Sequence, residues 1–198
     1  MNSKVIVCDL DGMINNNIPF SKKYSKKFGI EESIMLDFFY NEFQDCILDR
    51  ADLKEVLGKY LKIWKWPGTV EELITYWFED EVNPDKETVE IISTLRGDGL
   101  MTCLLTNNER YRMKFMSEKL NFDSMFEKVF SSYEIGFKKP EQEAFSYVYE
   151  HVNTVDSLEK NDFLFWDDDL DNVKGAQEFG FQAFQFTNAK EFEEICRK

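Results

Sequence analysis

Histidine and paired cysteines are scarce in this 198-residue sequence. It contains one histidine, His151, and four cysteines, none of which belongs to a C-x-x-C pair. Because zinc sites draw most of their ligands from these two residue types, a zinc site is disfavoured. Two of the cysteines, Cys8 and Cys103, lie inside apolar runs typical of strands, which favours buried thiols.

Long apolar runs are also missing. No run approaches the roughly 20 residues that a membrane-spanning helix requires. Asp9 interrupts the first apolar run, which excludes that run as the core of a signal peptide. The sequence therefore predicts a soluble, cytoplasmic protein without a membrane partner.

Positive charge is in short supply. Lysine and arginine number 24 against 38 aspartates and glutamates, which gives a formal net charge of -14. A surface this acidic repels nucleic acid and anionic lipid, so we expect no nucleic-acid partner. It also repels phosphorylated small molecules, and a site for such a molecule needs local cations.

Apolar residues make up 43% of the chain, which is enough for a sizeable core. Short apolar runs predict five strands: VIVCDL at 5–10, MTCLLT at 101–106, KVF at 128–130, FLFW at 163–166 and FQAFQF at 181–186. Helical patterns alternate with these strands from residue 85 onward, and one such helix is expected to begin at Pro140. This alternation predicts the doubly wound parallel sheet of an α/β protein, with a Rossmann-like core.

The segment from residue 20 to about residue 80 shows only helical periodicity, without an intervening strand. It separates the first strand from the rest of the alternating pattern. The sequence thus divides into an α/β core, residues 1–14 and 83–198, and a small helical cap, residues 15–82, inserted after the first strand.

Polar side chains follow four of the predicted strands at the points where the strands end. In open parallel sheets, ligands bind beyond these carboxyl ends, so we expect the side chains to meet at one edge. They are Asp9 and Asp11 after the first strand, Thr106, Asn107 and Asn108 after the second, Lys138 and Lys139 after the third, and Asp167, Asp168, Asp169, Asp171 and Asn172 after the fourth.

So many carboxylates repel one another. Two unit charges about 4 Å apart cost roughly 4 kcal/mol at an effective dielectric of about 20. A cation among them removes this cost, and an all-oxygen ligand set favours a hard ion, with Mg²⁺ the usual choice beside phosphate. The sequence therefore predicts a magnesium site that recruits an anionic substrate.

The order of these motifs resembles the haloacid dehalogenase (HAD)-like superfamily, whose members are mostly Mg²⁺-dependent phosphatases. The motifs are D-x-D-G at Asp9–Gly12, Thr106, Lys139-Pro140, and D-D-x-x-x-N at Asp167–Asn172. The double aspartate and the small helical cap are similar to the helical-cap phosphatase branch. The resemblance implies a phosphomonoester hydrolase that acts on a small phosphorylated metabolite through an aspartyl-phosphate.

The resemblance also implies the catalytic roles. Asp9 is expected to be the nucleophile, and Asp11 is expected to protonate the leaving oxygen and later to deprotonate the attacking water. Thr106 and Lys139 are expected to bind the transferring phosphoryl group. Asn107 is expected to orient the phosphate.

The magnesium ligands implied by the resemblance are Asp9, the backbone carbonyl of Asp11, and Asp168. Asp167 and Asn172 are expected to hold Asp168 or the water molecules of the metal. From the residues alone, Asp167 and Asp169 stay open as rivals of Asp168, and Lys138 stays open as a rival of Lys139.

Other functions stay open at this stage. A phosphomutase or phosphotransferase of the same superfamily uses the same residues and differs in how well water is excluded. A non-catalytic phosphate-binding relative is a further alternative. A dehalogenase is disfavoured because its chemistry does not need the second aspartate, Asp11. The sequence does not indicate the oligomeric state or the physiological substrate.

Overall fold

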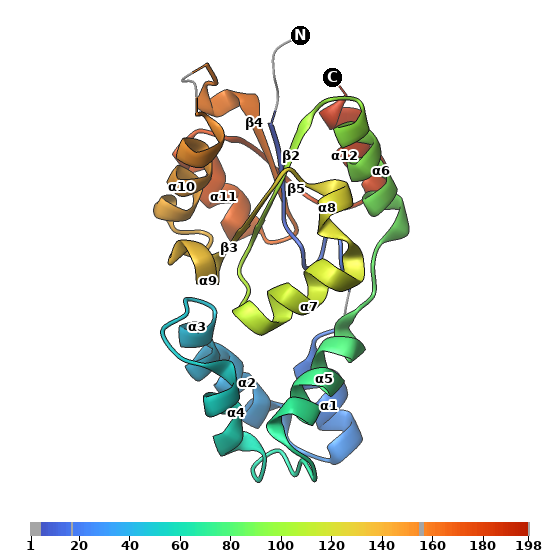
Figure 1. Ribbon diagram of the computed structural model, residues 1–198, viewed down its shortest axis with the longest axis vertical. Helices are drawn as coiled ribbons and strands as arrows, with labels where there is room; N and C mark the ends of the chain where they lie inside the picture. The colour runs from blue at the N-terminus through green and yellow to red at the C-terminus, as the bar shows by residue number, and fades with distance from the viewer. Residues whose placement is uncertain (1–4, 17, 155–156, 198) are drawn as a thin grey trace.

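A parallel sheet occupies the centre of the upper of the two bodies in Figure 1, and the structure, a computed structural model, describes residues 5–16, 18–154 and 157–197. The sheet has five strands in the order β3-β2-β1-β4-β5. They are β1 (Val5–Cys8), β2 (Met101–Thr106), β3 (Lys128–Ser131), β4 (Phe163–Asp167) and β5 (Gln182–Gln185). All four strand pairs are parallel, so the predicted α/β class is confirmed.

The register of the sheet brings the predicted strand ends together. Cys8 of β1 is aligned with Leu104 of β2 on one side and with Trp166 of β4 on the other. The strands β1, β2 and β4 consist almost entirely of buried residues, as parallel strands covered on both faces require. Their carboxyl ends therefore open at the same edge.

Helices cover both faces of the sheet (Figure 1). One apolar core joins the sheet to α6 (Lys86–Gly97), α7 (Arg110–Leu120), α8 (Phe122–Met125) and α12 (Ala189–Cys196). A second core on the other face joins it to α9 (Ser132–Ile135), α10 (Gln142–Val152) and α11 (Leu170–Phe179). A short 3-10 helix, η1 (Lys160–Asp162), precedes β4.

One predicted helix boundary is wrong. The helix expected to begin at Pro140 begins instead at Gln142, with Glu141 as its N-cap residue. The backbone N–H of Glu141 donates to the carbonyl of Lys138 at 2.9 Å, so Pro140 lies inside a turn. This turn ends the segment that carries Lys139 and precedes the first helical turn.

Helices α1 to α5, called the helical insertion below, form the lower body in Figure 1. They are α1 (Phe20–Phe28), α2 (Glu32–Tyr40), α3 (Glu42–Cys46), α4 (Leu53–Tyr60) and α5 (Val70–Glu81). Thr69 and Glu72 form a capping box at the start of α5, and Asp52 caps α4. No helix in the described ranges is long and apolar enough to cross a bilayer.

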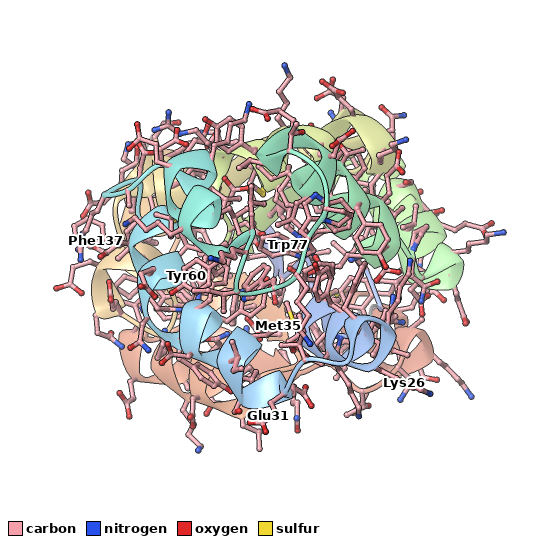
Figure 2. All side chains as sticks on the ribbon, turned by 90° about the horizontal axis from the view of Figure 1, so that it is seen from below. Lys26, Glu31, Met35, Tyr60, Trp77 and Phe137 are labelled. Atoms are coloured by element: carbon pink, nitrogen blue, oxygen red, sulfur yellow. The ribbon has the colours of Figure 1, made fainter. Side chains whose placement is uncertain are left out.

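The helical insertion has its own aromatic core. Phe38, Trp64 and Trp77 are almost fully buried in it, and the ring centroids of Phe38 and Trp64 are 5.0 Å apart. Figure 2, viewed from the side of the insertion, shows Met35 and Trp77 inside and Lys26 and Glu31 at the rim. Large rings let a small helical body bury enough area to be stable.

Two chain segments connect the insertion to the sheet, and they run side by side. Asn15 lies in the outgoing segment, and its side-chain carbonyl accepts the backbone N–H of Asn83 at 2.8 Å. Its amide donates to the carbonyl of Glu81 at 3.0 Å. The backbone N–H of Asn16 also donates to the carbonyl of Asn83, at 2.9 Å.

Further contacts join the insertion to the sheet body on the opposite side. The hydroxyl of Tyr111 donates to Asp52 at 2.6 Å, and the hydroxyl of Ser132 donates to the carbonyl of Ile47 at 2.6 Å. Arg110 forms an ion pair with Asp49. The insertion is therefore held at two places, and a pocket lies between the two bodies.

Candidate active site

Lys139 lies at the centre of the site. Its ammonium nitrogen is 2.6 Å from Oδ1 of Asp9 and 2.6 Å from Oδ2 of Asp167, and the residue is 3% exposed. Burial alone would lower the pKa of Lys139, but the two carboxylates raise it above its usual range. Lys139 therefore carries a fixed positive charge where the acidic chain would otherwise repel an anion.

The rival lysine lies elsewhere. Lys138 donates to the side-chain carbonyl of Gln44 in the helical insertion at 2.7 Å. Asn107 instead holds the backbone of Lys139 from both sides, accepting its N–H at 2.8 Å and donating to its carbonyl at 2.9 Å. The amide of Asn107 is thus engaged in positioning the lysine, which the sequence did not suggest.

Asp167 and Asp169, the rivals of Asp168 as a metal ligand, both form hydrogen bonds within the protein. Asp167 is fully buried, and its carboxylate accepts hydrogen bonds from Lys139, from the amide of Asn172 and from the backbone N–H of Asp169. The side chain of Asp169 caps α11 by accepting the backbone N–H of Asp171. Asp168 and Asp169 are both exposed, but only Asp168 brings a carboxylate oxygen close to those of Asp9 and Asp167.

Asp9, Asp167 and Asp168 form a cluster that could hold a metal ion. Each offers a carboxylate oxygen, and these oxygens lie within 4.8 Å of one another. Carboxylate oxygens are the donors that hard divalent cations prefer, so the donor set fits Mg²⁺. Because hydrogen bonds occupy Asp167, Asp9 and Asp168 are the members better placed to contact an ion directly.

Gly12 makes room for Asp168. Its φ is +80°, and a Cβ built on it would lie 2.1 Å from Oδ2 of Asp168. Glycine therefore satisfies two requirements here, the left-handed backbone and the close approach of a carboxylate.

Burial raises the pKa of Asp9 to about 8, although Lys139 acts in the opposite direction. Asp167 is paired with the same ammonium group, and its negative charge raises the pKa of Asp9 further. One ammonium between two buried carboxylates leaves an uncompensated negative charge, which favours a proton or a metal cation at Asp9.

Asp11 faces a different partner. Arg112 of α7 donates to both of its oxygens, with Nη2–Oδ1 of 2.6 Å and Nη1–Oδ2 of 2.8 Å, and its Nε lies 2.9 Å from Oε2 of Glu81. Arg112 is 4% exposed and Glu81 is buried. Burial alone would raise the pKa of Asp11, but the charge and hydrogen bonds of Arg112 hold it below its usual range.

Asn108 connects Asp11 to Thr106. Its amide donates to the hydroxyl oxygen of Thr106 at 2.8 Å and to Oδ2 of Asp11 at 3.2 Å. Its side-chain carbonyl accepts from Arg112, and its backbone carbonyl accepts from the hydroxyl of Ser131 at 2.9 Å. Thr106 is buried at the end of β2, as the strand pattern predicted.

The sequence pattern places Asn108 at the sheet edge without a role, and it gives no indication of Arg112 or Glu81. The only sequence signal for Arg112 is a cation placed directly before Met113, on the buried face of α7. Glu81 ends α5, more than thirty positions earlier in the chain, so no local pattern joins the two. The site therefore has two groups, one around Lys139 and one around Arg112.

A pocket of about 340 Å³ opens from the Arg112 group into the space between the two bodies. Asp11, Asn107 and Arg112 line it from the sheet side. The helical insertion contributes mainly aromatic side chains to it, among them Phe39, Phe43 and Trp77. A ligand held at the carboxylate cluster could extend into this pocket past Asp11.

Comparison with known proteins gives a family match and shared folds. A family model described as haloacid dehalogenase-like hydrolase matches residues 6–186. The HAD family enzyme BT-2542 from Bacteroides thetaiotaomicron shares the fold with a TM-score of 0.83 at 22% identity over 98% of each chain. A further structure of the wild-type form of that enzyme is a complex with magnesium and inorganic phosphate, with a TM-score of 0.78, 22% identity, and coverage of 97% of this chain and 98% of that chain.

A more distant structure of the same fold carries a different ligand. The L-2-haloacid dehalogenase from Xanthobacter autotrophicus, with chloropropionic acid covalently bound, is 16% identical over 91% of this chain and 76% of that chain, with a TM-score of 0.65. Structures of this fold thus bind different ligands, and the fold alone does not identify the reaction.

Proposed function

The chain belongs to the haloacid dehalogenase-like hydrolases, and from this premise we propose that it is a magnesium-dependent phosphomonoester hydrolase. Its substrate is a small phosphorylated metabolite, and the reaction passes through an aspartyl-phosphate on Asp9. The observation that carries the proposal is the placement of Lys139 between Asp9 and Asp167, beside Asp168. This arrangement offers a nucleophile, a fixed cation and metal-binding oxygens at one point.

Asp9 performs the first displacement in this proposal. A carboxylate oxygen of Asp9 forms a bond to phosphorus while the bond between phosphorus and the ester oxygen breaks. Lys139, 2.6 Å from Asp9, stays close to the phosphoryl oxygens and offsets their charge. A covalent intermediate divides one difficult displacement into two easier ones.

Thr106 binds a phosphoryl oxygen. Its hydroxyl oxygen already accepts a hydrogen bond from Asn108, so its own hydrogen is free to be donated. Asn107 contributes indirectly, because its amide fixes the backbone of Lys139.

Asp11 is the proton-transfer group in this proposal. Arg112 favours its ionised form, which is the form that takes a proton from the water molecule attacking the aspartyl-phosphate. In the first step Asp11 must be protonated in order to donate a proton to the leaving oxygen. The positive charge of Arg112 opposes this protonation. Asp11 also supports a phosphatase over a dehalogenase, because the latter reaction does not need a second aspartate.

Magnesium would be held by Asp9, Asp168 and the backbone carbonyl of Asp11. When bound it supplies electrostatic stabilisation of the phosphoryl oxygens. Asp167 and Asn172 would fix the loop that carries Asp168, as their hydrogen bonds at 3.1 Å indicate. The magnesium and phosphate bound by the Bacteroides enzyme support the same choice of ion and substrate here.

The helical insertion is proposed to be the cap that selects the substrate, with residues 15–82 as the cap and residues 1–14 and 83–198 as the catalytic core. Residues 1–4, 17, 155–156 and 198 within these boundaries lie outside the described residues. The same proposal includes a cytoplasmic location. It also includes the absence of a nucleic-acid partner, which the acidic charge of the chain favours.

The test is phosphate release from an aryl phosphate by the purified protein with Mg²⁺, compared with the Asp9→Asn variant. We expect turnover in the parent and none in the variant. Turnover retained in Asp9→Asn would reject the covalent mechanism. A parent protein that transfers phosphate between sugar positions but not to water would replace the phosphatase by the phosphomutase alternative.

A further inference from the structure

The pocket between the two bodies has an aromatic wall. The rings of Phe39, Phe43 and Trp77 lie against one another, with centroid separations of 5.3 Å (Phe39–Trp77), 5.4 Å (Phe39–Phe43) and 5.5 Å (Phe43–Trp77). All three line the pocket. Two of these pairs meet edge to face and the third is tilted, so the rings leave flat apolar surfaces that suit another ring better than a polyhydroxylated chain.

On the opposite wall of the pocket, the side chains of Arg112 and Asn107 already form hydrogen bonds within the protein. Arg112 uses Nε, Nη1 and Nη2 on Glu81, Asp11 and Asn108. The amide of Asn107 is bonded to the backbone of Lys139 at both its oxygen and its nitrogen. A sugar hydroxyl at this wall would lose its water without gaining these partners, which is unfavourable. The hydroxyls of Ser21 and Tyr40, which also line the pocket, are too few to replace the water of a polyhydroxylated chain.

The charge of the pocket opposes a second anion. Arg112 is the one cation among the described residues that line it, and it is paired with two carboxylates, Asp11 and Glu81. The charges of these three groups sum to -1. A leaving group with its own phosphate or carboxylate would therefore be repelled at close range.

We propose that this pocket takes the leaving group of the substrate, and that this group is uncharged, planar and largely apolar. The inference rests on the proposed function, since the carboxylate cluster next to the pocket would hold the phosphate. It specifies the substrate class as phosphate monoesters of ring-bearing alcohols, in contrast to sugar phosphates and bisphosphates. The volume of about 340 Å³ accommodates such a group.

The experiment compares three esters of primary alcohols, so that the reactivity of the leaving group is similar. They are benzyl phosphate, 4-carboxybenzyl phosphate and glucose 6-phosphate. We expect kcat/KM for benzyl phosphate to exceed each of the others by about tenfold or more, because a site that lacks partners for polar groups discriminates against them. A higher kcat/KM for glucose 6-phosphate or for the carboxylated ester would overturn the inference and leave the proposed function standing.

A size change in the pocket gives a second readout. Phe43→Ala removes one ring of the wall and should raise the ratio of kcat/KM for 1-naphthylmethyl phosphate over benzyl phosphate by about tenfold. Phe43→Leu should raise it less, and it serves if the alanine variant does not fold. Phe28→Ala is the matched control, since Phe28 packs in the same aromatic core, against Tyr24, but does not line the pocket.

Binding without turnover separates the two proposals. Calorimetry on the Asp9→Asn protein with Mg²⁺ should show benzylphosphonate binding at least about tenfold more tightly than methylphosphonate. Equal binding of the two phosphonates would contradict the apolar pocket. Failure of the parent to hydrolyse any phosphate ester, with benzylphosphonate still preferred, would reject the proposed function and not the character of the pocket.

Discussion

Arg112 holds both carboxylate oxygens of Asp11, at 2.6 and 2.8 Å, from a position on α7 that is almost fully buried. Two parallel N–H to oxygen bonds fix the orientation of the aspartate as well as its charge. The same guanidinium contacts Glu81 at the end of α5. One side chain thus connects the proposed proton-transfer group to the helical insertion.

Replacement of this arginine should change both activity and stability. Arg112→Met removes the cation that lowers the pKa of Asp11, so the limb of the pH–rate profile that reports Asp11 should move to higher pH. Glu81 is then buried without its cation, and the free energy of unfolding should fall by roughly 3–5 kcal/mol. Urea denaturation and kcat/KM from pH 5 to 9 measure the two effects.

A double variant serves as the control for the arginine. Arg112→Met combined with Glu81→Gln removes the unpaired buried charge and should recover part of the lost stability. The double variant should keep the displaced pH profile, because Asp11 still lacks its cation. A profile identical to that of the parent in both variants would exclude control of Asp11 by Arg112.

Magnesium affinity should depend on pH through Asp9. Burial raises the pKa of Asp9 to about 8, so at lower pH a bound cation must displace a proton. The apparent Kd for Mg²⁺ should therefore rise by about tenfold for each unit that the pH falls below that value. Calorimetric titrations at pH 6, 7 and 8 test this, and Asp9→Asn should show weaker binding with a flatter pH dependence. A Kd that is the same at pH 6 and 8 in the parent would contradict it.

Gly12→Ala should impair the metal site beyond the cost of backbone strain. The added Cβ would overlap the carboxylate of Asp168, which must then move. Gly136→Ala is a matched control, because Gly136 has a φ of +79° and a Cβ there would meet nothing within 4 Å. Both variants should lose about 1–2 kcal/mol of unfolding free energy from the left-handed backbone.

Only the Gly12 variant should bind Mg²⁺ more weakly, by at least about tenfold, which corresponds to about 1.4 kcal/mol. Titration of both variants with Mg²⁺, alongside thermal unfolding, separates the two contributions. Equal magnesium affinity in the two variants would show that Asp168 does not need the space above Gly12.

Glu109 should make stability depend on pH. It is 1% exposed and caps α7, and burial raises its pKa to about 7 despite the backbone N–H groups that it accepts. An acid whose folded-state pKa is raised opposes folding once it ionises. The unfolding free energy should therefore fall as the pH rises from about 4.5 to about 7, by up to roughly 1.4 kcal/mol per unit, and level off above.

Glu109→Gln removes this titration and keeps a side-chain oxygen that can cap the helix. Urea denaturation at pH 5, 6, 7 and 8 should show the variant gaining stability relative to the parent as the pH rises. A constant difference across that range would mean that Glu109 is not the titrating group.

Much of the architecture followed from local patterns. Runs such as Val5–Cys8 and Phe163–Trp166 are apolar on both faces, and a short run of that kind favours a buried parallel strand. Once the strands were placed, the parallel sheet required that Asp9, Thr106 and Asp167 lie near one edge. This part of the prediction needed no knowledge of long-range contacts.

The second group of the site could not be found in that way. Arg112 and Glu81 meet because the helical insertion folds back on α7, and that docking leaves no periodic signal in the sequence. The strand pattern did place Asn108 at this edge, but not its contact with Arg112. Asn107 illustrates the same point: the family resemblance implied that it orients the phosphate, and the structure shows its amide bonded to the backbone of Lys139. Pairings between segments distant in the chain decide these details.

The asparagine cross-links at the junction have a mechanical consequence. Asn15 forms hydrogen bonds with Glu81 and Asn83 of the returning segment, so sliding of the two connecting segments past each other would break both bonds. A rotation of the helical insertion about this junction would also have to break the contacts of Tyr111, Ser132, Arg110 and Lys138 with the insertion. Such a rotation would move Phe39 and Phe43 away from Asp11, on the other side of the pocket, whereas Glu81, next to the junction, would move least.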